Sequence, residues 1–187
     1  MGKVWSINNN FGENKKIKEN YIFILSFILP MVIMFVVFTS LGVGFIGDKT
    51  IVSSDMYTQY VAYFGKFKDI LSGDGSIFYS FNKSIGGNNI GLFAYYLASP
   101  LNLLLILFPK SAIGEFIFII YLIKIGLASL CFSLYISKVY KKKDLFVVIF
   151  SLCYALMSYN ICFQMNIMWM DGMMLLPLVA LGIEEII

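Results

Sequence analysis

The stretch YIFILSFILPMVIMFVVFTSL, from Tyr21 to Leu41, decides the class of this protein because it contains no charged side chain. A helix needs about 20 predominantly apolar residues to cross the hydrocarbon core of a bilayer. The stretch therefore predicts a membrane-spanning helix, in which Pro30 is tolerated. It is longer than the apolar region of a signal peptide and lacks a clean cleavage site, so we interpret it as a retained span.

The composition of the whole chain agrees with a membrane protein. Of its 187 residues, 59% are hydrophobic and only 13% are charged, about half the charged share of a soluble domain. The basic residues are all lysines, the net charge is only +3, and the lysines lie beside apolar runs. This pattern favours orientation in a lipid bilayer over nucleic-acid binding. The absence of histidine excludes His-ligated metals and a histidine base.

The positions of the lysines predict how the apolar runs cross the membrane. Further apolar runs cover residues 113–136, 145–163 and 173–187, and a weaker one, 90–108, is interrupted by Pro100 and Asn102. Lysine clusters precede residue 21 and follow residue 136, and the positive-inside rule assigns both to the cytoplasm. An even number of crossings must separate them, so we interpret 90–108 as an outer re-entrant or interfacial hairpin. The alternative is that 90–108 spans fully and the second cluster faces outside.

The predicted fold class is therefore an all-α integral membrane protein with about four transmembrane helices. Residues 1–20 are expected to form a partly disordered cytoplasmic tail, and residues 42–112 an outer loop. Within that loop, apolar residues recur three or four apart between Asp55 and Leu71, which predicts an aromatic-rich amphipathic helix on the membrane surface. Gly73 is suited to the left-handed position that ends such a helix.

Three ionisable residues are candidates for chemistry, and each has a structural alternative. Asp55 and Asp171 each precede a predicted helix in an outer loop, so each is either a helix cap or a carboxylate acting as general base or metal ligand. From spacing alone the cap is favoured. Lys124 lies in the middle of a predicted span, where it could hold a phosphate or form an ion pair. Glu115 lies too far along the same helix to be its partner.

Several short motifs together resemble the amino-terminal part of the YfhO-type bacterial membrane proteins. They are Ser54–Tyr60 (SDMYTQY), Gly86–Asn88, Tyr95–Asn102 (YYLASPLN), Phe108–Pro109, Leu122–Lys124 and Trp169–Asp171. The resemblance covers nearly all of the chain from Tyr21 onward. It implies a glycosyltransferase of the multi-spanning GT-C architecture, which moves a sugar from a polyprenyl-phosphate carrier to an extracellular cell-envelope acceptor such as lipoteichoic acid.

The resemblance also implies roles for particular residues. Asp55 matches the catalytic acidic residue of the first outer loop, Asp171 resembles a second acidic position, and Lys124 would meet the carrier phosphate. Acceptor or sugar contacts fall to three neighbours of Asp55, namely Tyr57, Gln59 and Tyr60. Whether a divalent cation takes part stays open. The implied location is the bacterial cell membrane, with a cytoplasmic amino terminus and an extracellular Asp55 loop.

One departure from the resemblance leaves other functions open. Members of the family are several times longer, and this chain stops within its last apolar run. We therefore expect a fragment, with a partner chain supplying the missing spans, and activity in this chain stays uncertain. The alternatives are a non-catalytic membrane fragment, or a transporter or lipid-handling subunit that uses Lys124. A transporter would more often show paired intramembrane charges or internal repeats.

Overall fold

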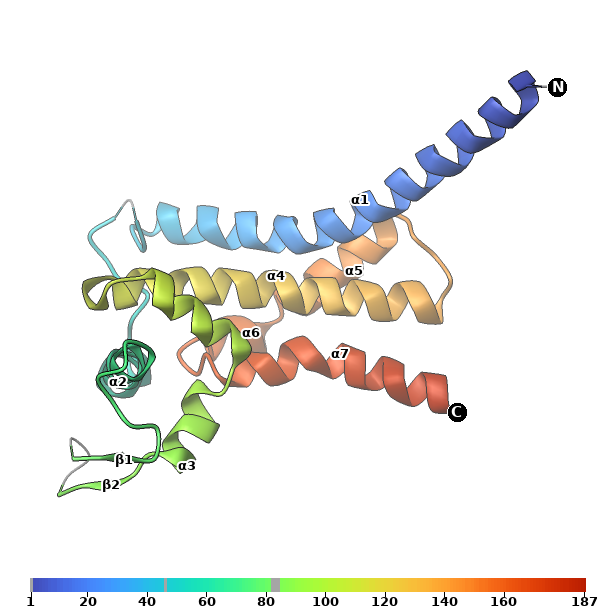
Figure 1. Cartoon of the computed structure of the whole chain (residues 1–187). Helices are drawn as coiled ribbons and strands as arrows, with labels where there is room; N and C mark the ends of the chain where they lie inside the picture. Colours follow the sequence, from blue (N-terminus) through green and yellow to red (C-terminus); the bar gives the residue numbers. More distant parts are fainter. Residues whose placement is uncertain (1, 46, 82–84) are drawn as a thin grey trace.

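Three long helices dominate the structure, a computed structural model that describes residues 2–45, 47–81 and 85–187, with side chains from residue 20 onward. Helix α1 (Gly2–Ser40) and helix α4 (Ile113–Val139) lie side by side in opposite directions (Figure 1). Helix α7 (Trp169–Ile186) runs in the same direction as α4 and packs along its second half. The ends of α4 and α7 are joined by an ion pair of 3.5 Å between Lys138 and Glu185.

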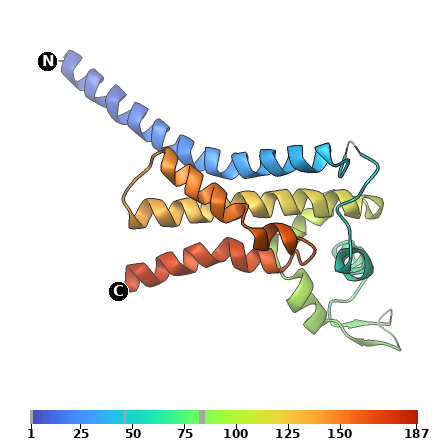
Figure 2. The ribbon, with the colours of Figure 1, turned by 180° about the vertical axis from the view of Figure 1, so that it is seen from behind.

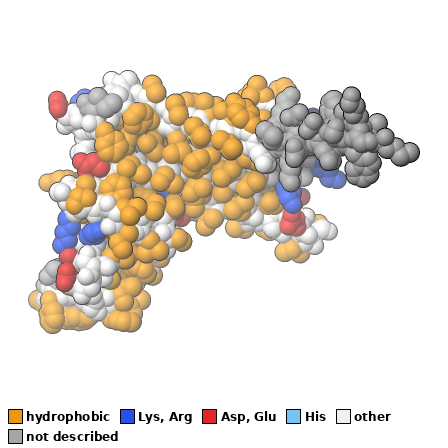
Figure 3. Space-filling view, turned by 45° about the horizontal axis from the view of Figure 1, so that its top comes forward, with side chains coloured by type: hydrophobic (Ala, Val, Ile, Leu, Met, Phe, Trp, Pro, Cys, Tyr) orange, Lys and Arg blue, Asp and Glu red, His pale blue; other side chains and the backbone are white. Residues whose placement is uncertain are grey.

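The two strongest predicted spans are confirmed as helices of sufficient length and hydropathy. They are residues 20–40 of α1 and residues 110–139, which contain α4. Helix α1 begins at Gly2, so the segment expected as a partly disordered tail continues this helix. Charged side chains gather toward the two ends of the molecule, and the belt between them is mostly apolar (Figure 3). The chain is an all-α membrane protein.

The apolar run 145–163 does not form one continuous helix. It divides into α5 (Leu145–Ala155) and the short α6 (Ser158–Cys162), separated by a turn at Leu156 and Met157. Helix α5 leans diagonally across the bundle and contacts both α1 and α4 (Figure 2). Its 11 residues extend for about 16 Å, roughly half the thickness of a hydrocarbon core.

The helix predicted between Asp55 and Leu71 is present. It begins with a wide turn, η1 (Met56–Tyr60), and continues as α2 (Val61–Leu71). Its buried face packs against α4, where the rings of Phe64 and Phe116 lie 5.2 Å apart. Gly73 adopts a φ of +89°, which confirms the predicted left-handed end of this helix.

Residues 90–107 form a sharply bent segment, called the bent segment below. A small antiparallel hairpin, β1 (Tyr79–Ser80) with β2 (Gly87–Asn88), leads into α3 (Ile90–Leu92) and η2 (Phe93–Leu97). The chain then turns by 92° and continues as η3 (Pro100–Leu107) and the short η4 (Lys110–Ala112).

The bend has a local cause in the sequence. Ser99 is extended, as the residue before a proline prefers, and Pro100 starts the next helix. The side-chain amide of Asn102 donates a 3.2 Å hydrogen bond to the carbonyl of Leu97 and so ties the two arms together. The same bend fits a re-entrant loop or a broken span, so the predicted outer hairpin stays a prediction.

Helix α1 approaches α4 closely at a glycine. A Cβ atom placed on Gly126 would lie 2.8 Å from the sulfur of Met31 and 2.9 Å from the ring of Phe27. Small residues at such positions let membrane helices approach closely. This contact lies two residues from Lys124 along α4.

Candidate functional site

Lys124 occupies the middle of α4 and is almost completely buried. Its side chain is 1% exposed, and its Nζ lies 2.9 Å from Oδ2 of Asp171. The same ammonium donates a 2.8 Å hydrogen bond to the carbonyl oxygen of Ile167. An ammonium in the hydrocarbon region requires such compensation. The structure shows the ion pair, and the phosphate-binding role of Lys124 stays a prediction.

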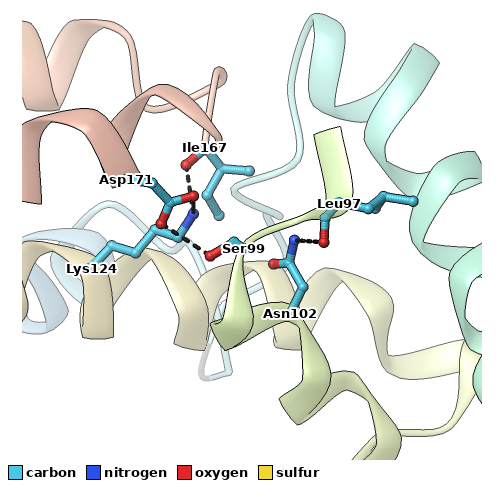
Figure 4. Close-up of polar contacts among 6 residues, drawn as sticks. All are labelled: Leu97, Ser99, Asn102, Lys124, Ile167 and Asp171. Carbon is cyan, nitrogen blue, oxygen red and sulfur yellow. Dashed lines mark hydrogen bonds and ion pairs between the residues drawn. The ribbon is translucent and has the colours of Figure 1, made fainter. Parts of the chain in front are cut away.

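Asp171 connects three parts of the chain. It lies in the first turn of α7, where a negative charge is favourable beside the positive end of the helix dipole. While Oδ2 pairs with Lys124, Oδ1 accepts a 3.0 Å hydrogen bond from the hydroxyl of Ser99. Figure 4 shows these contacts joining α4, α7 and the bent segment around one carboxylate. The side chain of Asp171 is 24% exposed, so one side of the group remains accessible.

The position of this group along the bundle can be given relative to α4. That Asp171 belongs to an outer loop stays a prediction. Lys124 comes eleven residues after Ile113, the first residue of α4, and this separation is about 16 Å along the helix axis. Asp171 and the bend at Ser99 are therefore level with the middle of α4. The reason is that α5 and α6 are too short to carry the chain back to the start of α4.

Asp55 has different neighbours from those of a helix cap. It occupies the position before η1, but its side chain makes no capping hydrogen bond. Instead, its Oδ1 accepts a 3.3 Å hydrogen bond from the amide of Gln59, one helical turn later. The Oε1 of Gln59 accepts a 2.7 Å hydrogen bond from the hydroxyl of Tyr96. Asp55 is thus linked through Gln59 to the bent segment.

The two tyrosines near Asp55 differ sharply in their surroundings. Tyr57 is 74% exposed, whereas Tyr60 is completely buried and packs its ring edge-on against Tyr96 at 5.3 Å. Among the described residues, the Tyr60 hydroxyl has no hydrogen-bond partner. Burial raises the pKa of Tyr60 above its ordinary value, and the nearby backbone of Met168 partly opposes this rise. Tyr60 therefore packs the helix that follows Asp55 (η1 and α2, called the Asp55 helix below) close to the chain that leads into α7.

The structure brings most of the candidate residues to the two arms of one bend. Lys124 and Asp171 contact each other, and Asp171 contacts Ser99. Asp55 and Gln59 reach Tyr96, three residues before Ser99. The mostly exposed side chain of Tyr57 makes none of these contacts. In the described part of the chain, His, Cys, Asp and Glu do not gather in threes as a metal site would require.

Ser99 and Tyr96 were not recognised as site residues from the sequence. Both lie in the motif YYLASPLN, which was noted only for the resemblance. Ser99 and Asp171 are 72 residues apart, and no spacing rule connects positions so distant. A serine or tyrosine in an apolar run is the available signal, because polar groups at that depth need partners.

Comparison with known proteins identifies the family. The family model described as "Bacterial membrane protein YfhO" matches residues 26–187. No curated protein and no solved structure matches the chain. The match includes α4, α7, the Asp55 helix and the bent segment. Since it covers most of the sequence, the chain belongs to the YfhO family of bacterial membrane proteins.

Proposed function

We propose that this chain is the amino-terminal part of a membrane glycosyltransferase. The reaction transfers a sugar from a polyprenyl-phosphate carrier to an extracellular cell-envelope acceptor such as lipoteichoic acid. Membership of the YfhO family supports a bacterial membrane protein. The observation that carries the enzymatic proposal is the Asp55 carboxylate, which is held by Gln59 and is not used as a helix cap.

Asp55 would act as the general base. The amide of Gln59 holds Oδ1, which leaves Oδ2 to accept the proton of an acceptor hydroxyl. The deprotonated oxygen would attack the anomeric carbon of the sugar, and the carrier phosphate would leave. Tyr57 offers an exposed ring beside Asp55, and aromatic faces suit the apolar faces of sugar rings. Because Tyr60 is buried, its part would be to support the helix.

Lys124 and Asp171 would act together at the carrier phosphate. A lysine ammonium has three N–H donors, and two of them are used by Asp171 and Ile167. A phosphate approaching along the exposed side of Asp171 would take the third donor and compete with the carboxylate for the charge. Asp171 would thereby keep Lys124 charged until the carrier binds, while Ser99 holds the carboxylate in place.

The antiparallel arrangement of α1 and α4 supports the proposed orientation. Residues 20–40 begin at the same end of the bundle at which α4 ends, because Lys143 lies 5.8 Å from the ring of Phe23. Both lysine-rich ends would then face the cytoplasm, with one crossing in each direction between them. The opposite end, with Asp55 and α2, would be extracellular.

Complementation with Asp55→Asn tests the catalytic assignment. The variant is expressed in its natural full-length context in cells lacking the protein, and glycosylation of the envelope polymer is measured at matched protein levels. The expected result is loss of glycosylation, because an amide cannot accept the proton. Asp48→Asn is the matched control, since Asp48 is an exposed acidic residue of the same outer segment. Full glycosylation with Asp55→Asn would reject Asp55 as the general base.

A further inference from the structure

A groove lies at the opposite end of the bundle from Asp55, between the end of α4 and the start of α5. Its volume is about 530 Å³, and aromatic and aliphatic side chains of both helices line most of it. On the α5 side, Phe146 and Phe150 are 68% and 57% exposed. This volume lies within the range of ordinary ligand sites. The groove shares no residue with the site around Lys124.

The groove extends from the apolar belt to the lysine-rich end. Its α4 side runs from Phe132 to Tyr140, the residue that follows the end of α4, and the eight steps between them span about 12 Å along the helix. Deeper parts of this wall are apolar, and the shallow end carries the hydroxyl-bearing ring of Tyr140, which is 67% exposed. Tyrosine is favoured where an apolar body meets a polar interface. The groove therefore follows the direction in which a lipid chain lies.

Two opposite charges stand at the shallow end of the groove. Lys142 is exposed there, and Asp144 lies two residues later at the start of α5. Asp144 occupies the N-cap position, but its side chain makes no capping hydrogen bond. Its Oδ1 is buried and has no hydrogen-bond partner among the described residues. A buried carboxylate oxygen without a hydrogen-bond donor destabilises the fold. A ligand that supplies a donor to Asp144 would remove this cost.

We propose that this groove binds a phospholipid that carries a primary amine, of the phosphatidylethanolamine type. One acyl chain occupies the aromatic part, the phosphate contacts Lys142, and the ammonium donates a hydrogen bond to the carboxylate of Asp144, whose side chain turns to bring the unpartnered Oδ1 to the groove. The headgroup carries one negative and one positive charge, which complement the opposite charges of Lys142 and Asp144 in the lining of the groove. Charge-assisted hydrogen bonds are about twice as strong as neutral ones.

The charges also distinguish this occupant from others. A phosphatidylcholine headgroup has the same charges but no N–H donor, so it cannot satisfy Asp144. A phosphatidylglycerol headgroup has donors but would place no positive charge beside the carboxylate. A second copy of the chain would have to bury Lys142 and Asp144 together with the exposed rings of the groove.

Lipid retention by the purified full chain tests the proposal. The protein is exchanged into detergent with equal amounts of phosphatidylethanolamine and phosphatidylcholine of identical acyl chains, and bound lipid is counted by native mass spectrometry. We expect phosphatidylethanolamine to be preferred by about tenfold, the value of one charge-assisted hydrogen bond. Equal retention of the two lipids would overturn the proposal, as would a chain dimer that occupies the groove without lipid.

Matched variants assign the preference to particular side chains. Asp144→Asn should remove the preference for phosphatidylethanolamine while retaining phosphate-dependent binding. Lys142→Gln should weaken the binding of both lipids equally. Lys141→Gln is the control, because Lys141 is exposed but does not line the groove. Phe150→Trp should reduce all lipid binding by filling the acyl part. A preference unchanged in Asp144→Asn would show that this carboxylate is not the acceptor.

Discussion

The ion pair between Lys124 and Asp171 predicts that single substitutions of its two partners destabilise the protein by different amounts. Asp171→Ala leaves an ammonium that is 1% exposed without its counter-charge, whereas Lys124→Met leaves a carboxylate that is 24% exposed. Breaking a buried pair by removing one partner costs about 3–5 kcal/mol, so Asp171→Ala should approach this range. In Lys124→Met, Asp171 keeps its hydrogen bond from Ser99 and stays partly hydrated. This variant should therefore lose only about 1–2 kcal/mol of stability.

The double variant makes the test sharper. Lys124→Met combined with Asp171→Ala removes both charges and should be more stable than Asp171→Ala alone, because no buried charge remains. Stability is measured by unfolding the protein in mixed micelles with increasing SDS and following helical circular dichroism. Expression and monodispersity are matched between variants before comparison.

Two results would refute this reasoning. If Lys124→Met cost as much as Asp171→Ala, the difference in burial would not control the energetics. If the loss of unfolding free energy in the double variant equalled the sum of the losses in the two single variants, the two residues would not interact in the folded protein. A strong interaction should instead give a coupling free energy of about 1–3 kcal/mol between the two sites.

Two further predictions concern packing. Gly126→Ala should destabilise the fold by about 1–3 kcal/mol in the same unfolding assay, because the new Cβ would overlap Met31; Gly182→Ala, which meets no neighbouring atom within 4 Å, should be neutral or stabilising. Tyr60→Phe should stabilise by about 1 kcal/mol because the lost hydroxyl is buried without a partner. Since burial raises the pKa of Tyr60, folding favours its neutral form. The wild type should therefore lose stability as pH rises above about 10, and Tyr60→Phe should lose less.

The sequence was most informative where a single property controls the structure. The uncharged run Tyr21–Leu41 predicted its span because hydropathy and length alone determine that outcome. The periodic aromatic residues between Asp55 and Leu71 predicted a helix, and Gly73 predicted its end. Local rules also explain the bend, since Pro100 and the extended Ser99 interrupt the helix at that point.

The site itself depended on contacts that no local rule describes. Lys124 was recognised as costly at its depth, but Asp171, its partner, is 47 residues away. Spacing alone favoured a helix cap for Asp55, whereas in the structure the carboxylate accepts a hydrogen bond from Gln59, one turn later, and makes no capping bond. The run 145–163 looked like one span because hydropathy does not register the turn at Leu156 and Met157.

The shortness of α5 affects the membrane around the protein. A helix of 11 residues covers about half of a hydrocarbon core that is about 30 Å thick. Where α5 faces lipid, the bilayer would thin locally, and headgroups and water would come closer to the level of Asp171. Such thinning costs a fraction of a kcal/mol per ångström of mismatch. The bilayer would thus be deformed most where the polar group is deepest, and a charged substrate would cross less hydrocarbon to reach it.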